Sequence, residues 1–299
     1  MNTLNLLGVI KDRVLSYLKL CKFSIMLPVT LTGFTGYFYF SPHFSLNLIL
    51  VSLGILLSAI SASVFNQLQE IEIDRKMART HNRPLPAGQL KKGDALAMGI
   101  TFLIAGVIII KFSGTTAAAL ICLTTIFWYN AVYTPLKKIT AFAVVPGAIT
   151  GALPPLIGWV AAGGHILDKP SIFIAFLMFT AQVPHFWLLI MRFGIEYRDA
   201  GIPSLISLMS PLQISRLTFT WVAASVAAAL FLCYFGIIMS GLIIAFLVVV
   251  SFLLLLYFSK LLRNCNNISM YNRYSRILDI YFLLILLLLI IDRIIISSV

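Results

Sequence analysis

The chain has 299 residues, of which 60% are hydrophobic and only 11% are charged, and its mean hydropathy is +1.00. This composition excludes an ordinary soluble protein and predicts an all-α protein that crosses the membrane several times. The net charge of +12 would favour nucleic-acid binding in a soluble protein, but here the basic residues lie mostly between apolar segments, where they determine topology. We therefore expect membrane lipid as a partner and no nucleic acid. The four cysteines lack the spacing of a disulfide framework or a zinc site.

Apolar segments follow one another along a single membrane-embedded domain, residues 1–299. Residues 1–22 mix basic and apolar side chains and are typical of an amphipathic segment at the cytoplasmic surface. Nine transmembrane helices are expected at residues 23–41, 45–69, 94–112, 115–133, 140–162, 171–191, 212–237, 241–262 and 275–297. Lys and Arg gather in the N-terminal segment and in the loops after the second, fourth, sixth and eighth spans. We therefore expect the N-terminus in the cytoplasm and the C-terminus outside.

The end of the second span carries three polar residues, Asn66, Glu70 and Asp74, at steps of four. On a continuous helix this spacing forms one polar stripe. Two carboxylates four residues apart repel each other, and the low dielectric at a membrane helix end strengthens the repulsion. A cation between the carboxylates would relieve it, and oxygen ligands suit Mg²⁺. The stripe therefore predicts a metal site.

Basic residues follow the carboxylates, among them Arg79 and Arg83, and Lys137 and Lys138 lie in the loop after the fourth span. Acidic and then basic residues at a membrane surface predict a site for a metal-bridged diphosphate. The alternative is an ordinary loop of solvated charges. Lys137 and Lys138 are expected either to contact the diphosphate or anchor a loop over it, or to serve topology alone.

The fifth span contains six residues that bend or loosen a helix: Pro146, Gly147, Gly151, Pro154, Pro155 and Gly158. Such a density predicts a bend beside a cavity. Close helix packing through small residues is the other interpretation, and the two are compatible.

A second polar segment ends the sixth span, where His185, Arg192 and Glu196 share one helix face. His185 would lie about 10 Å inside the membrane from Arg192, at 1.5 Å per residue. An ionisable residue at that depth predicts a functional site. The alternative is a neutral histidine that hydrogen-bonds to a neighbouring helix.

These two segments predict a reaction at the mouth of an apolar bundle. Mg²⁺ and basic side chains would stabilise a departing diphosphate, and a hydrocarbon tail would lie between the helices. Apolar and aromatic walls would shield the allylic cation that remains. The aromatic candidates are Phe65, Trp128, Tyr129, Tyr133, Phe186 and Trp187.

The first segment resembles the acidic motif of the UbiA superfamily of intramembrane prenyltransferases, which has nine helices. The resemblance rests on Asn66, Glu70 and Asp74, followed by Arg79-Thr80 and Arg83-Pro84-Leu85, with glutamate at position 70 where aspartate is usual. It implies prenyl transfer, with Mg²⁺ held by Asn66, Glu70 and Asp74. It also implies a catalytic set of Asn66, Glu70, Asp74, Arg79, Arg83, Lys137 and Lys138.

Within the superfamily, three stretches resemble the branch that farnesylates heme: YTPLKKIT at 133–140, GAITGALPPLIGW at 147–159, and PHF with AGIP at 184–203. The resemblance implies transfer of a farnesyl group from farnesyl diphosphate to a vinyl group of heme b, with addition of water, in a bacterial cytoplasmic membrane. It implies a heme site at His185, Arg192 and Glu196, although Ile195 stands where a second acid is common. Heme A synthase or a terminal oxidase assembly are the implied protein partners.

Two other functions fit parts of the sequence. A related prenyltransferase acting on a quinone precursor or on chlorophyllide would use Glu70 and Asp74 in the same way. An ion-coupled transporter would instead show inverted repeats and charges at the membrane midplane. The sequence shows no such repeat, and its carboxylates lie at helix ends.

Overall fold

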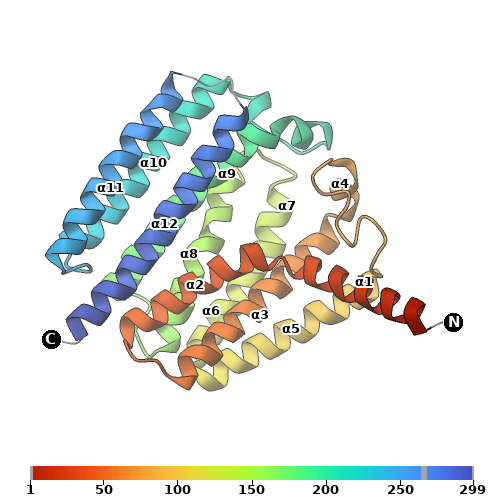
Figure 1. Cartoon of the computed structure of the whole chain (residues 1–299), viewed down its shortest axis with the longest axis horizontal. Helices are drawn as coiled ribbons and strands as arrows, with labels where there is room; N and C mark the ends of the chain where they lie inside the picture. The colour runs from red at the N-terminus through yellow and green to blue at the C-terminus, as the bar shows by residue number, and fades with distance from the viewer. Residues whose placement is uncertain (1–2, 264–267, 298–299) are drawn as a thin grey trace.

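A computed structural model describes residues 3–263 and 268–297, with side chains described at 11–263 and 270–297 (Figure 1). These residues form helices and no strand. The helices are α1 (Thr3–Cys21), α2 (Phe23–Phe40), α3 (Leu46–Gln69), α4 (Ile71–Lys76), α5 (Lys92–Ser113), α6 (Thr116–Phe127), η1 (Trp128–Tyr133), α7 (Thr134–Leu136), α8 (Val144–Ala161), α9 (Lys169–Asp199), η2 (Leu205–Ser207), α10 (Pro211–Tyr234), α11 (Gly241–Ser259), η3 (Lys260–Leu262) and α12 (Ile268–Ser297).

Eight helical segments of the described chain are long and apolar enough to cross a membrane, and α1 with α2 adds a ninth across a bend of 44°. This confirms the expected all-α membrane architecture. Two helices extend beyond the predicted spans. Helix α9 continues past residue 191 to Asp199, with charged residues in its last turns. Helix α12 begins at Ile268, before the span predicted from residue 275.

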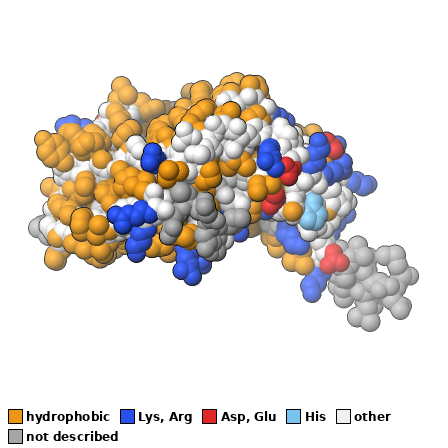
Figure 2. Space-filling view, turned by 90° about the horizontal axis from the view of Figure 1, so that it is seen from above, with side chains coloured by type: hydrophobic (Ala, Val, Ile, Leu, Met, Phe, Trp, Pro, Cys, Tyr) orange, Lys and Arg blue, Asp and Glu red, His pale blue; other side chains and the backbone are white. Residues whose placement is uncertain are grey.

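The long helices form a bundle in which helices pack both against their neighbours in sequence and against helices distant in sequence. Helix α3 packs against α5 and α2, α2 packs against α8, and α8 packs against α6 and α9. Helix α9 also contacts α10 and α12, and α12 returns to α2 (Figure 1). The short helix α4 and its loop lie at one end of this bundle, beside the ends of α3 and α9. Charged side chains gather mainly around that end, whereas hydrophobic side chains cover much of the opposite end (Figure 2).

Small residues let α2 and α8 approach closely, as one interpretation of the fifth span predicted. A Cβ atom at Gly158 would overlap the carbonyl oxygen of Gly33, and one at Gly36 would overlap the carbonyl of Pro155. Pro155 lies inside α8, which runs unbroken past it. Helix α8 therefore serves as a close-packed wall, and its residues Thr150, Gly151, Pro154 and Ile157 also border a cavity.

Candidate active site

The polar stripe lies where α3 gives way to α4, and the expectation of one continuous helix was wrong. Glu70 interrupts the helix with φ −115° and ψ 11°. Tertiary contacts replace the regular turn at this point, because Lys137 pairs with the Glu70 carboxylate and Lys138 Nζ donates to the Gln69 carbonyl at 3.4 Å. The Asp74 backbone N–H still donates to the Glu70 carbonyl at 2.8 Å, so both carboxylates remain close together.

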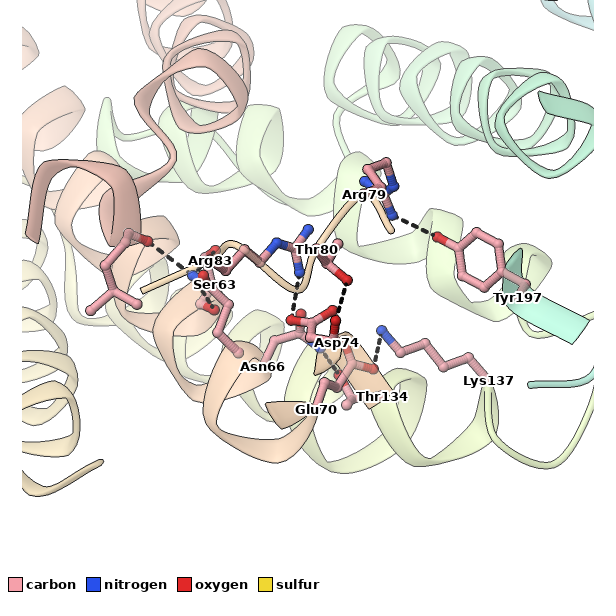
Figure 3. Close-up of polar contacts among 12 residues, drawn as sticks. Ser63, Asn66, Glu70, Asp74, Arg79, Thr80, Arg83, Thr134, Lys137 and Tyr197 are labelled. Carbon is pink, nitrogen blue, oxygen red and sulfur yellow. Dashed lines mark hydrogen bonds and ion pairs between the residues drawn. The ribbon is translucent and has the colours of Figure 1, made fainter. Parts of the chain in front are cut away.

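Burial distinguishes this cluster from a loop of solvated charges. Asn66, Glu70 and Asp74 are only 4%, 6% and 3% exposed. Arg83 Nη1 donates to Asp74 Oδ2 at 2.7 Å, while the Thr80 hydroxyl donates to the Asp74 carbonyl at 2.9 Å (Figure 3). Buried carboxylates require such partners, since an uncompensated charge in this environment would be strongly destabilising.

The amide of Asn66 is fixed by an irregular segment of a neighbouring helix. Asn66 Nδ2 donates to the Thr134 hydroxyl at 3.1 Å, and this hydroxyl donates to the Tyr129 carbonyl at 2.8 Å. Residues Trp128–Tyr133 form the π-helix η1 between α6 and α7. Short π-helical insertions are frequent at functional sites, because they change the direction of side chains that follow. Here the insertion precedes the turn that brings Lys137 to Glu70.

The oxygen atoms of this cluster suit a hard divalent cation. Arg83 occupies one oxygen of Asp74, and Lys137 pairs with one oxygen of Glu70. No described residue donates a hydrogen bond to Asp74 Oδ1, Glu70 Oε2 or Asn66 Oδ1. These three oxygens lie on one short stretch of chain and accept no hydrogen bond from a described residue. They therefore fit the oxygen coordination that Mg²⁺ prefers.

Lys22 is a member of this cluster that sequence reasoning missed. It separates α1 from α2 with φ 49° and ψ 48°, and it is the one non-glycine residue of positive φ in the described chain. Such left-handed conformations are costly for ordinary residues and concentrate at functional sites. Gln67 on α3 holds the preceding turn, because its Nε2 donates to the Leu20 carbonyl at 2.9 Å.

The charges that act on Lys22 identify its surroundings. Lys22 lies at the bend between the two halves of the span formed by α1 and α2. The charges of Arg83, Lys137, Asp74 and Glu70 all act on it. Lys22 therefore stands among the same carboxylates and bases as the predicted residues. Only its backbone conformation and burial distinguish it from a lysine that serves topology.

The two predicted polar segments meet through Arg79. Its backbone N–H donates to Glu196 Oε2 at 3.1 Å, and its Nη2 donates to the Tyr197 hydroxyl at 3.1 Å. The guanidinium also lies over the Phe193 ring, at 5.1 Å from the centroid. Arg79 thus joins the loop after α4 to α9, whereas Arg83 is the arginine that reaches a carboxylate of the stripe (Figure 3).

His185 lies apart from the carboxylate cluster and pairs with another helix. Its Nδ1 is 2.7 Å from Oδ1 of Asp279 on α12. Sequence reasoning missed Asp279, although a carboxylate within an apolar span is a signal that could have found it. Arg192 stacks on the Phe193 ring at 4.3 Å, is exposed, and forms no ion pair with the described residues.

An apolar cavity of about 180 Å³ lies within the bundle. Residues of α2, α3, α6, η1, α8 and α9 line it, with Tyr129 and Phe186 as its aromatic members. Tyr133 borders a smaller pocket beside Lys137. The other aromatic candidates lie outside these cavities: Trp187 packs edge-to-face on Trp221, Phe65 contacts Gly99, and Trp128 donates to the Pro146 carbonyl.

Known proteins share this sequence pattern over most of its length. The profile of the UbiA prenyltransferase family matches residues 26–289. The protoheme IX farnesyltransferase of Oleidesulfovibrio alaskensis is 37% identical over 73% of this chain and 77% of its own. That of Geobacter sulfurreducens is 40% identical over 62% of this chain and 68% of its own.

Solved structures share the fold at lower identity. A UbiA homologue from Aeropyrum pernix superposes with a TM-score of 0.72 at 17% identity, over 93% of this chain and 99% of that one. A UbiA homologue from Archaeoglobus fulgidus, bound to GPP and Mg²⁺, gives a TM-score of 0.63 at 17% identity, over 91% and 99%. With a family profile that spans most of the residues and a matching fold, the chain belongs to the UbiA prenyltransferase family.

Proposed function

We propose that this prenyltransferase moves a farnesyl group from farnesyl diphosphate to a vinyl group of heme b, with addition of water, and so makes heme O. The observation that carries the proposal is a buried cluster of carboxylates and bases at the end of a bundle that encloses an apolar cavity, together with His185, whose neighbour Phe186 lines that cavity. The names of the curated relatives support heme as the acceptor.

Asn66, Glu70 and Asp74 would hold Mg²⁺ through the oxygens that no described residue occupies. When bound, the metal neutralises charge that develops on the leaving diphosphate. The UbiA homologue with bound GPP and Mg²⁺ supports this assignment.

The basic residues of the cluster are arranged to receive the diphosphate. Arg83 and Lys137 each pair with one carboxylate, so both cations already point into the site. Lys22 adds a third basic side chain, on which the charges of Arg83, Asp74 and Glu70 act. Preorganised cations stabilise the charge of the departing group without rearranging during the reaction. Arg79 instead positions the loop that carries Arg83, because its own contacts are with α9.

The farnesyl chain would occupy the apolar cavity, where Tyr129 and Phe186 present their rings. The bond between C1 of the farnesyl group and the diphosphate oxygen breaks, and its electron pair leaves with the diphosphate. The vinyl group then supplies the pair that forms the new carbon–carbon bond. Water captures the resulting cation at the carbon next to the macrocycle and releases a proton. Aromatic walls would stabilise the positive carbon and exclude water until the acceptor has reacted.

His185 and Arg192 would bind the heme. A neutral imidazole ligates iron, and a guanidinium binds a propionate. Glu196 holds the Arg79 backbone, so its part is to join the diphosphate and heme ends of the site. The concentration of basic residues near this end supports a mouth on the cytoplasmic side of a bacterial inner membrane, in one domain spanning 1–299. Heme A synthase or a terminal oxidase assembly would receive the product.

Mass analysis of extracted hemes tests the proposal. Membranes that contain the full chain should accumulate a heme heavier than heme b by a farnesyl group and one water, and membranes with Asp74→Asn should not. A prenylated quinone precursor or chlorophyllide, with heme b unchanged, would assign the chain to the other acceptor class.

A further inference from the structure

We propose that Asp279 is a positioning residue for His185, and that its carboxylate accepts the Nδ1 proton and leaves Nε2 to ligate the iron of the heme substrate. This inference rests on the proposed function. Its basis is the 2.7 Å separation between His185 Nδ1 on α9 and Asp279 Oδ1 on α12, across 94 residues of sequence.

Asp279 is a carboxylate within a candidate membrane span. It lies in Met270–Ser297, and ionisable residues inside membrane spans are usually paired. Helices α9 and α12 pack against each other, which brings the two side chains together. At its far end α12 is fixed by Asp292, which accepts hydrogen bonds from the Met239 and Ser240 backbones. The place of Asp279 beside α9 is therefore set by the packing of a whole helix.

The pair remains accessible, unlike a pair that serves only to join two helices. The side chains of His185 and Asp279 are 36% and 50% exposed. Among the described residues, His185 has one hydrogen-bond partner, which is Asp279 at Nδ1. The Phe186 ring lies edge-on at 6.0 Å from the imidazole centroid. A ligand can thus approach His185 on the side of Nε2.

The hydrogen bond at Nδ1 determines whether Nε2 of the imidazole can ligate iron. A neutral imidazole has one nitrogen that donates and one that accepts, and the partner of one nitrogen determines the role of the other. A carboxylate at Nδ1 favours the proton there and frees the lone pair of Nε2. Histidines that ligate metals usually donate their second N–H to a carboxylate, a carbonyl or water, and this partner raises the basicity of the ligand.

The position also suits transfer to a vinyl group. Phe186, the next residue, lines the apolar cavity assigned to the farnesyl chain, so iron held by His185 would place the macrocycle beside that chain. Arg192 lies about 10 Å further along α9, at 1.5 Å per residue, and has no acidic partner in the described chain. Its guanidinium is available for a propionate.

The test uses the full-length protein in lipid nanodiscs, titrated with heme b. Asp279→Asn keeps a hydrogen-bond acceptor but removes the charge, and we expect heme affinity to fall about 10-fold or more. The iron–histidine stretching frequency of the ferrous complex should also fall, because a neutral partner makes the ligand less basic. Asp279→Glu should restore part of both, whereas Mg²⁺-dependent binding of farnesyl diphosphate should not change.

Tyr281→Phe is the matched control, because it removes a hydrogen bond between α12 and Ser251 on α11, away from His185. It should leave heme affinity and the stretching frequency as they are. Wild-type values in Asp279→Asn would overturn the inference, and so would an unchanged heme spectrum in His185→Ala. Equal loss of heme and diphosphate binding in Asp279→Asn would reduce the pair to a structural one. Heme O formation by the wild type is measured in parallel, and its absence would overturn the proposed function instead.

Discussion

Arg83 Nη1 lies 2.7 Å from Asp74 Oδ2, so an arginine of the first motif pairs with a carboxylate of the same motif. Lys137, from the loop after α7, pairs in the same way with Glu70. Each carboxylate of the motif thus has one oxygen bound by a base and one oxygen without a protein donor in the described chain. This division of the oxygens underlies the first prediction.

Asp74→Asn should lower the rate of prenyl transfer by about 100-fold or more, because it removes a charge that binds the metal and orients Arg83. The measurement is turnover at limiting Mg²⁺. Glu72→Gln is the matched control, since Glu72 lies two residues away, is 71% exposed and pairs with Arg75 on the surface. Similar turnover in the two variants would contradict the metal assignment.

The neighbouring lysines should behave differently when changed separately. Lys137 is half-buried and paired with Glu70, so Lys137→Gln should raise the KM for farnesyl diphosphate about 10-fold or more. Lys138 is exposed and donates only to the Gln69 carbonyl at 3.4 Å, so Lys138→Gln should change the KM less than about twofold. An unchanged KM in Lys137→Gln would mean that both lysines serve only to determine the membrane topology.

Lys22 should contribute to diphosphate binding through its charge, because the charges of Arg83, Asp74 and Glu70 act on it in the same cluster. Lys22→Gln should raise the KM for farnesyl diphosphate about 10-fold. Lys22→Arg, which stays charged, should keep the KM within about twofold of the wild-type value.

An unchanged KM in Lys22→Gln would mean that Lys22 serves membrane topology alone. The arginine variant also keeps the left-handed backbone position occupied by a long basic side chain. A change in fold is thereby separated from a change in charge.

The contact of α2 with α8 predicts a loss of stability. A methyl group at Gly158 would overlap the Gly33 carbonyl, and backbone cannot move aside as a side chain can, so Gly158→Ala should lower the melting temperature in detergent by several degrees or prevent folding. Gly93→Ala is the control, because a Cβ atom there meets nothing within 4 Å. Equal melting temperatures would mean that the helices separate at little cost.

The sequence predicts much of this arrangement, because hydropathy determines the spans and spacing places three polar residues on one helix face. It does not predict the interruption at Glu70, since residues 66–76 contain no glycine or proline. The residues that contact Glu70 and Gln69 at this point are Lys137 and Lys138, which belong to a loop distant in sequence. Contacts of this kind depend on how the helices pack.

The missed residues have the same explanation. Lys22 is one of several bases in the N-terminal segment, and only its backbone angles and burial place it in the cluster. Asp279 is separated from His185 by 94 residues, so no local pattern joins them. Conversely, the sequence grouped Arg79 with Arg83, and the structure shows that they contact different elements.

Purified protein provides the most direct test of the central claim, that this cluster transfers a farnesyl group to heme. The full chain in nanodiscs would be incubated with heme b, farnesyl diphosphate and Mg²⁺ in water enriched in oxygen-18, and the hemes analysed by mass. We predict one new heme that carries a farnesyl group and one labelled hydroxyl oxygen, formed only with Mg²⁺ and absent with Asp74→Asn. Recovery of unmodified heme b from the wild-type reaction, with farnesyl diphosphate bound or consumed elsewhere, would contradict the account.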